Sequence, residues 1–269
     1  MRPAEFLATH PLFTRAELQA ALQSRGHRAG ATVTSHLVRW QRQGRVRRVK
    51  QGVYLREPEG SSAQGTAVDF PLLASRLAED AVLAYHTALE VHGLAQSLYE
   101  RLFFATWTKT KPLRFAGRLF VPVRPRAGLL RAGEKLGWTE TRERSGQPLR
   151  VTALERTVVD VFDRPELAGG MEEVWRSCSA APPLDWRDVE RYAMLLGSRS
   201  LMGRLGYFLE RHAEVLGVPA RLLERLARRT PRVPVYMDRR RRGRLVARWN
   251  LIVPPDLLPN EEGSGDVHA

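Results

Sequence analysis

Cysteine is almost missing from this chain of 269 residues, in which Cys178 is the only one. A single thiol excludes an internal disulfide framework and a zinc site built from cysteines, so we expect Cys178 to pack as a small buried group. Long apolar runs are missing as well, and nothing predicts a membrane span or a signal peptide. These absences lead us to expect a soluble cytoplasmic protein.

Negative charge is also scarce. The chain has 29 Asp and Glu against 43 Lys and Arg, a formal net charge of +14. This excess predicts an anionic partner, nucleic acid first and a membrane surface second. Only four of the basic residues are lysine. Arginine suits bidentate contacts to phosphate and guanine, although GC-rich codon usage would produce the same bias.

Motifs of catalysis are missing too. The sequence has no P-loop, no dinucleotide-binding glycine pattern and no nucleophile elbow, and its seven histidines lack metal-ligand spacing. We therefore predict no enzymatic activity, no cofactor and no metal.

Two polar groups were weighed as sites. His86 and Glu90 are spaced i, i+4, and Arg156 precedes Asp160 and Asp163 in a helical pattern. The first set could be a metal site, and the two acids of the second could bind a metal or position a substrate. We favour structural roles for both: a packed helix with one satisfied histidine, and an intrahelical ion pair between Arg156 and Asp160.

The first 57 residues carry the strongest positive signal, with eleven Lys or Arg against three acids. The sequence predicts a short helix from Pro3 to Thr9. Thr14 and Glu17 form a capping box that begins a second helix. A third helix is predicted from about Thr32 to Gln43, with Val33, Leu37 and Trp40 on one face.

A basic hairpin follows, with strands predicted over 45–50 and 53–56 around a Gln51-Gly52 turn. Two helices and a basic hairpin are typical of a winged helix-turn-helix, in which one helix reads base edges and the wing follows the phosphate backbone. The alternative is an ordinary helical hairpin used for dimerisation or protein docking. The concentration of charge favours DNA.

The remainder predicts a second domain. Residues 58–65 are a polar Pro/Gly/Ser linker, so residues 1–57 form one domain and residues 66–258 another. The second domain predicts mixed α+β structure with a mainly helical second half and a late strand over 244–253. Residues 259–269 predict a disordered tail. The whole chain is thus expected to be α+β.

A second basic cluster lies near the C-terminus. Its members are Arg239, Arg240, Arg241, Arg242 and Arg244. It is either a solvated loop between strands or a second surface for nucleic acid or an acidic partner; the sequence leaves both open.

Motifs in both halves resemble AbiEi-type antitoxins. The N-terminal motifs are Thr14–Leu18, Leu37 with Trp40, Gly44–Val49 and Gly52–Tyr54, and the later ones are His86–Leu94, Arg156–Asp160 and Asp163–Gly170. The similarity spans roughly residues 10–255. Residues 239–244 are not a hallmark of that family.

The resemblance implies an antitoxin of a bacterial type IV toxin–antitoxin system, active in abortive infection and phage defence. Such a protein represses its own operon at an inverted-repeat promoter and counters a nucleotidyltransferase-like toxin, often without a stable complex. Carried onto this chain, the recognition-helix contacts to DNA would be Thr32, Thr34, Ser35, His36, Arg39 and Arg42. The wing contacts would be Arg45, Arg47, Arg48, Lys50 and Gln51.

Two other functions remain open. One is a sequence-specific transcriptional regulator without a toxin partner, whose second domain senses a ligand or dimerises. The other is an enzyme acting on nucleic acid through Asp160 and Asp163. An inverted-repeat operator would place two copies side by side.

Overall fold

The computed structural model describes residues 2–23, 29–58, 68–133, 137–238 and 242–258 of a mixed α+β chain. Its contacts divide it into two units, Met1–Gly93 with Leu98–Ala153 and Leu94–Ser97 with Leu154–Ala269. The predicted linker, apart from Pro58, and the predicted tail lie outside the described residues. The N-terminal 57 residues therefore share a unit with the sheet that follows them.

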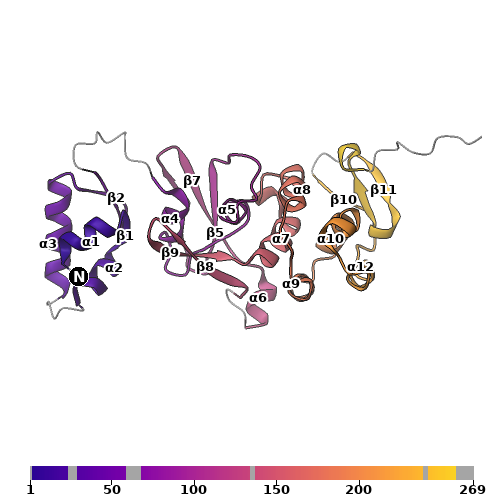
Figure 1. Cartoon of the computed structure of the whole chain (residues 1–269), viewed down its shortest axis with the longest axis horizontal. Coiled ribbons are helices and arrows are strands. Elements are labelled where there is room, and N and C mark those ends of the chain that lie inside the picture. Colours follow the sequence, from indigo (N-terminus) through magenta and orange to yellow (C-terminus); the bar gives the residue numbers. More distant parts are fainter. Residues whose placement is uncertain (1, 24–28, 59–67, 134–136, 239–241, 259–269) are drawn as a thin grey trace, which may run out of the picture. The chain divides into compact units, whose positions relative to one another are not determined.

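The chain opens with three helices and three strands (Figure 1). They are α1 (Pro3–Thr9), β1 (Leu12–Thr14), α2 (Arg15–Gln23), α3 (Ala29–Arg42), β2 (Val46–Lys50) and β3 (Val53–Arg56). The strands form an antiparallel sheet in the order β1-β3-β2. The helices and the hairpin follow the prediction, but β1 was not predicted, and α3 begins before Thr32.

Local chemistry explains these elements. The predicted capping box is confirmed: the backbone N–H of Thr14 donates to Glu17 Oε2 at 2.6 Å, and that of Glu17 donates to Thr14 Oγ1 at 3.1 Å. Gly52, at φ +82°, makes the hairpin turn, where an L side chain would be strained.

The small sheet is covered on both faces. Phe13, Tyr54 and Val46 pack with the apolar sides of the three helices. Leu12 and Leu55 instead join a second core with residues from the next sheet. The burial of Val53, Tyr54 and Leu55 in succession is the mark of a strand enclosed on two sides.

The rest of the first unit is built on a six-stranded mixed sheet in the order β6-β7-β5-β4-β9-β8. Its strands are β4 (Val82–Leu83), β5 (Arg101–Ala105), β6 (Leu113–Phe115), β7 (Arg118–Val123), β8 (Thr139–Arg144) and β9 (Gln147–Thr152). Its helices are α4 (Phe70–Ser75), α5 (His86–Val91) and α6 (Ala127–Arg131).

The second unit is mainly helical, in line with the helical second half predicted for residues 66–258. Its helices are α7 (Leu154–Asp163), α8 (Met171–Ser179), α9 (Trp186–Leu196), α10 (Arg199–Arg211), α11 (Ala213–Leu216) and α12 (Ala220–Ala227). A small sheet of β10 (Val235–Tyr236), β11 (Arg244–Val246) and β12 (Leu251–Val253) follows. The single strand predicted over 244–253 is instead two strands, because a 3-10 helix over Ala247–Trp249 and the left-handed Asn250, at φ +47°, separate them. Among the described residues, no helix is long and apolar enough to cross a membrane.

Candidate nucleic-acid interface

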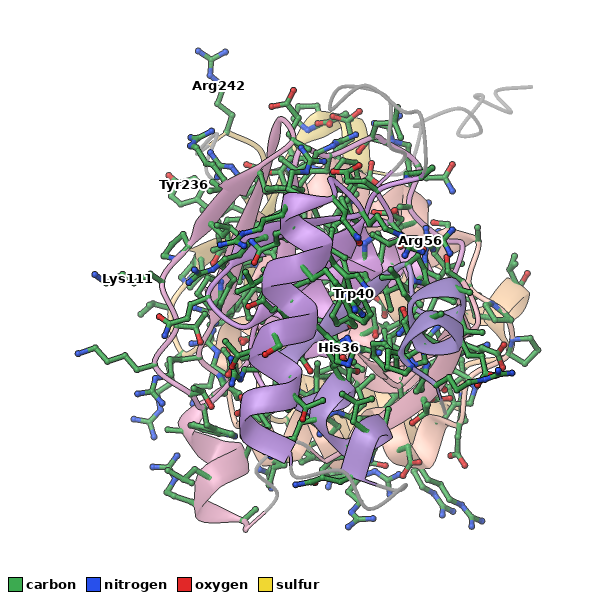
Figure 2. All side chains as sticks on the ribbon, turned by 90° about the vertical axis from the view of Figure 1, so that its left-hand side faces the viewer. His36, Trp40, Arg56, Lys111, Tyr236 and Arg242 are labelled. Atoms are coloured by element: carbon green, nitrogen blue, oxygen red, sulfur yellow. The ribbon has the colours of Figure 1, made fainter. Side chains whose placement is uncertain are left out.

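Helix α3 is anchored by one apolar face. Val33, Leu37 and Trp40 are each at most 2% exposed and pack with side chains of α1, α2 and the small sheet. The i, i+4, i+7 spacing that predicted this helix thus places its docking face. The polar face of α3 is left on the surface (Figure 2).

Six residues of α3 were predicted to contact DNA, and four of them are exposed on this polar face. Thr34, Ser35, Arg39 and Arg42 are exposed, whereas Thr32 and His36 are half-buried. The four exposed side chains, with Val38 and Gln43, line a shallow depression of about 420 Å³. Arginine with small hydroxyl side chains can contact both phosphates and base edges.

Two internal contacts organise this face. Arg15 Nη2 donates to Thr34 Oγ1 at 2.9 Å, which links α2 to α3. Arg39 Nη2 lies 2.9 Å from His36 Nδ1, and the His36 ring packs against Trp40 at 5.5 Å between centroids. His36 therefore orients Arg39 from the side of the helix rather than standing outward itself.

The sequence around α3 contains no acidic residue that could offset the positive charge of this face. No Asp or Glu occurs between Glu17 and Glu57. Both of these acids are ion-paired elsewhere, Glu17 with Arg76 at 2.8 Å and Glu57 with Arg47 at 2.6 Å. The stretch that contains α3 therefore carries an excess of positive charge, which a phosphate-binding surface would require.

Some basic side chains of the hairpin, predicted to contact DNA, instead contact other residues of the protein. Arg47 pairs with Glu57, and its guanidinium lies 5.1 Å from the centre of the Phe115 ring. Lys50 Nζ donates to the carbonyl of Leu77 at 2.8 Å. Two of the five expected wing contacts thus turn toward the six-stranded sheet, because one face of the small sheet packs against that part of the unit.

The other wing residues have different surroundings. Arg48 and Gln51 are exposed, and Arg48 Nε donates to the carbonyl of Lys50 at 3.4 Å. Arg45 is half-buried. The exposed side chains of the hairpin that could meet a phosphate are therefore those of Arg48 and Gln51.

The C-terminal arginine cluster is described only in part. Arg239, Arg240 and Arg241 lie outside the described residues, while Arg242 and Arg244 are exposed. Arg244 opens strand β11 opposite Val253.

The polar groups weighed for catalysis have structural contacts. Arg156 Nε donates to Asp160 Oδ2 at 3.1 Å, which confirms the predicted intrahelical pair. Tyr192 Oη donates to Asp160 Oδ1 at 2.8 Å, and all three residues are buried. Burial raises the pKa of the Asp160 carboxyl, and the charge of Arg156 opposes that rise.

The other candidate pair, His86 and Glu90, is divided between the core and the surface. His86 is 2% exposed and packs against the ring of Tyr99 at 4.9 Å, while Glu90 is exposed. Burial raises the pKa of the Cys178 thiol, which is expected of an unreactive core cysteine. Within the described part of the chain, no group of histidine, cysteine and acidic side chains could hold a metal.

A comparison with known proteins finds a solved structure with a similar fold but no matching family. Neither a protein family nor a curated protein matches this chain. A crystal structure of the Rv2827c protein from Mycobacterium tuberculosis matches with a TM-score of 0.56 and 17% sequence identity, over 93% of this chain and 89% of that one. At this identity the likeness concerns the fold alone.

Proposed function

We propose that this chain is a DNA-binding antitoxin of a type IV toxin–antitoxin system, which represses its own operon and counters a nucleotidyltransferase-like toxin. In this reading residues 1–57 are a winged helix-turn-helix, with α3 as recognition helix and the β2–β3 hairpin as wing. The observation that carries the DNA-binding part is the exposed face of α3. It presents Thr34, Ser35, Arg39 and Arg42 from a stretch without carboxylates.

The order of elements supports the same reading. A helix, a short strand, two helices and a hairpin, with the strands in the order β1-β3-β2, suit a module that supports one helix for the major groove. The contacts that half-buried Arg47 and Lys50 make within the protein shift the proposed DNA contacts toward α3, with Arg48 and Gln51 as the wing's contribution.

The antitoxin part is supported by the resemblance of the later motifs to AbiEi-type antitoxins. The alternative is a regulator without a toxin, and co-expression separates the two. Full-length protein made from an unrelated promoter should restore growth to cells that express the product of the adjacent gene. Rescue should persist when Arg39 and Arg42 are both alanine, since toxin neutralisation would not need operator binding. Failure of the wild-type chain to restore growth would favour the regulator.

Arg48 provides a separate test of the wing. Replacing Arg48 with alanine should weaken binding to promoter and unrelated DNA about equally, and lower the slope of log Kd against log salt by about one, since one phosphate contact is lost. Fluorescence anisotropy over a salt series measures both. Arg221→Ala, which removes the same charge from an exposed site on α12, is the matched control. An unchanged slope for the Arg48 variant would remove the wing from the interface.

A further inference from the structure

A cleft of about 780 Å³ lies within the first unit. One side is formed by the first turn of α2 and the turn of the β2–β3 hairpin, and the other by residues 75–79, Ala81, Thr141 and residues 148–150. Its volume is in the range of small-molecule sites, about 300–1,000 Å³.

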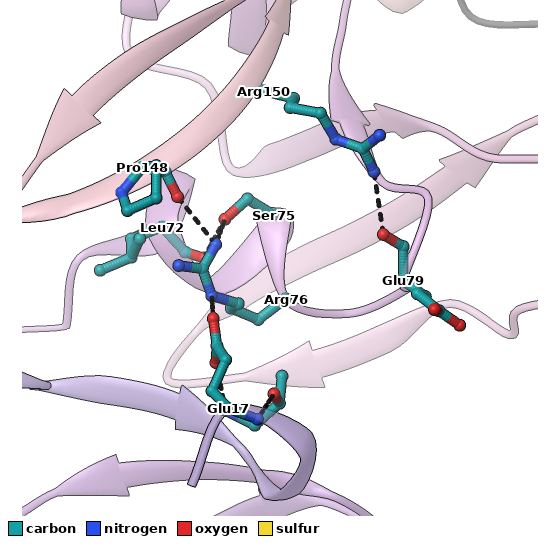
Figure 3. Close-up of polar contacts among 8 residues, drawn as sticks. Glu17, Leu72, Ser75, Arg76, Glu79, Pro148 and Arg150 are labelled. Carbon is teal, nitrogen blue, oxygen red and sulfur yellow. Dashed lines mark hydrogen bonds and ion pairs between the residues drawn. The ribbon is translucent and has the colours of Figure 1, made fainter. Parts of the chain in front are cut away.

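Four basic side chains line this cleft: Arg15, Lys50, Arg76 and Arg150. Arg76 is neutralised by Glu17 at 2.8 Å and also donates to the Pro148 carbonyl at 3.0 Å (Figure 3). It joins α2 to strand β9 and forms a fixed wall of the cleft.

The other three basic side chains donate hydrogen bonds to uncharged oxygens. Arg15 donates to Thr34 Oγ1 at 2.9 Å, Lys50 to the Leu77 carbonyl at 2.8 Å, and Arg150 to the Glu79 carbonyl at 2.8 Å. Among the described residues none of the three forms an ion pair. Within the described ranges their positive charges are therefore left without a carboxylate.

The acids of the cleft do not change this balance. Both oxygens of Glu17 are engaged, one by Arg76 and the other by the backbone N–H of Thr14. Arg150 donates to the backbone carbonyl of Glu79, and the Glu79 side chain is exposed. Burial lowers the pKa of the Lys50 ammonium, which marks a desolvated charge that an anion would stabilise.

The floor of the cleft is apolar. Val53, Leu77, Ala81 and Leu149 are all at most 4% exposed, and they belong to the core that joins the two sheets. An anionic group at the rim and an apolar body on this floor would together match the lining.

We propose that this cleft binds a small organic phosphate, with Lys50, Arg15 and Arg150 around the phosphate and the apolar body of the ligand against the floor. A phosphate is favoured over a carboxylate because several basic groups lack a counter-charge, and a dianion with three terminal oxygens can engage more than one of them.

Occupation of the cleft would act on DNA binding, a consequence that rests on the proposed function. Arg15 lines the cleft and also holds Thr34 on the exposed face of α3. A phosphate that draws Arg15 toward itself removes a positive charge and a support from that face. Ligand and DNA should therefore oppose each other, and by linkage each lowers the affinity of the other.

Calorimetry on the full-length protein tests the site without DNA. Phenyl phosphate and AMP are the probes, with phenol and adenosine as their uncharged counterparts. At least one phosphorylated probe should bind with a Kd below about 1 mM, and neither counterpart should bind. Lys50→Met and Arg150→Met should each weaken binding about ten-fold or more, whereas Arg242→Met, at an exposed site in the second unit, should not.

The proposal is overturned if neither phosphorylated probe binds, if an uncharged counterpart binds equally well, or if both cleft variants bind like the wild type while their thermal unfolding is unchanged. A gel shift at matched ionic strength then tests the consequence: the probe that binds should weaken promoter binding by the wild type and not by Lys50→Met. Phosphate binding without any DNA binding would leave the cleft assigned and reject the proposed function instead.

Discussion

A full-length protein in which Arg39 and Arg42 are both alanine should lose specific binding to its promoter. Both side chains are exposed on the same face of α3, and no carboxylate lies nearby in sequence to compensate them. An arginine contact to a guanine is worth about 1–3 kcal/mol, so the two together predict a loss of at least about thirty-fold in affinity. Gel shifts with promoter and unrelated DNA measure the loss and the change in specificity.

The matched control removes the same charge elsewhere. Arg221 and Arg228 are exposed in the second unit, so Arg221→Ala with Arg228→Ala lowers the net charge equally. If both double variants weaken binding to the same small extent, the effect is one of net charge, and α3 is not the reading helix. Unaltered thermal unfolding shows that the fold is retained, as expected for exposed positions.

The second large effect is on stability. Replacing Arg156 with methionine removes the positive partner of Asp160 while leaving that carboxylate buried beside Tyr192. Breaking one side of a buried ion pair costs about 3–5 kcal/mol, because the remaining charge stays desolvated. Urea unfolding at neutral pH should show a loss of this size.

The loss should depend on pH in a definite direction. Burial already raises the pKa of Asp160 against the opposing charge of Arg156, so the variant should have a folded pKa further above the unfolded value of about 3.9. Such a group stabilises the fold below the unfolded pKa, and this contribution is lost as the pH rises through the folded pKa. The deficit relative to the wild type should therefore be larger at pH 7 than at pH 5.

A compensating variant serves as the control. In Arg156→Met with Asp160→Asn the buried charge is gone, and the amide oxygen can still accept the hydrogen bond that the Tyr192 hydroxyl donates. Most of the lost stability should return, and the dependence on pH between 5 and 7 should vanish. If the double variant is as unstable as the single one, packing around Arg156 rather than its charge holds α7 in place.

The N-terminal elements could be predicted from the sequence because their signals are local. The capping box of Thr14 and Glu17, the spacing of Val33, Leu37 and Trp40, and the glycine of the hairpin turn each act within a few residues. Strand β1 was missed because three residues carry no periodicity, and they become a strand only by pairing with β3 some forty residues later.

The amino-acid order therefore accounts for the basic N-terminal module, the outward polar face of α3 and the pair of Arg156 with Asp160, all of which follow from neighbours along one helix or hairpin. Tertiary contacts decided which basic side chains remain exposed and which contact other parts of the protein. Packing of the small sheet against the next one turned Arg47 and Lys50 inward and brought Arg15, Arg76 and Arg150 to the same cleft. These contacts join segments more than a hundred residues apart, and neither the charge pattern nor the periodicity of the sequence indicates which distant segments will pack together.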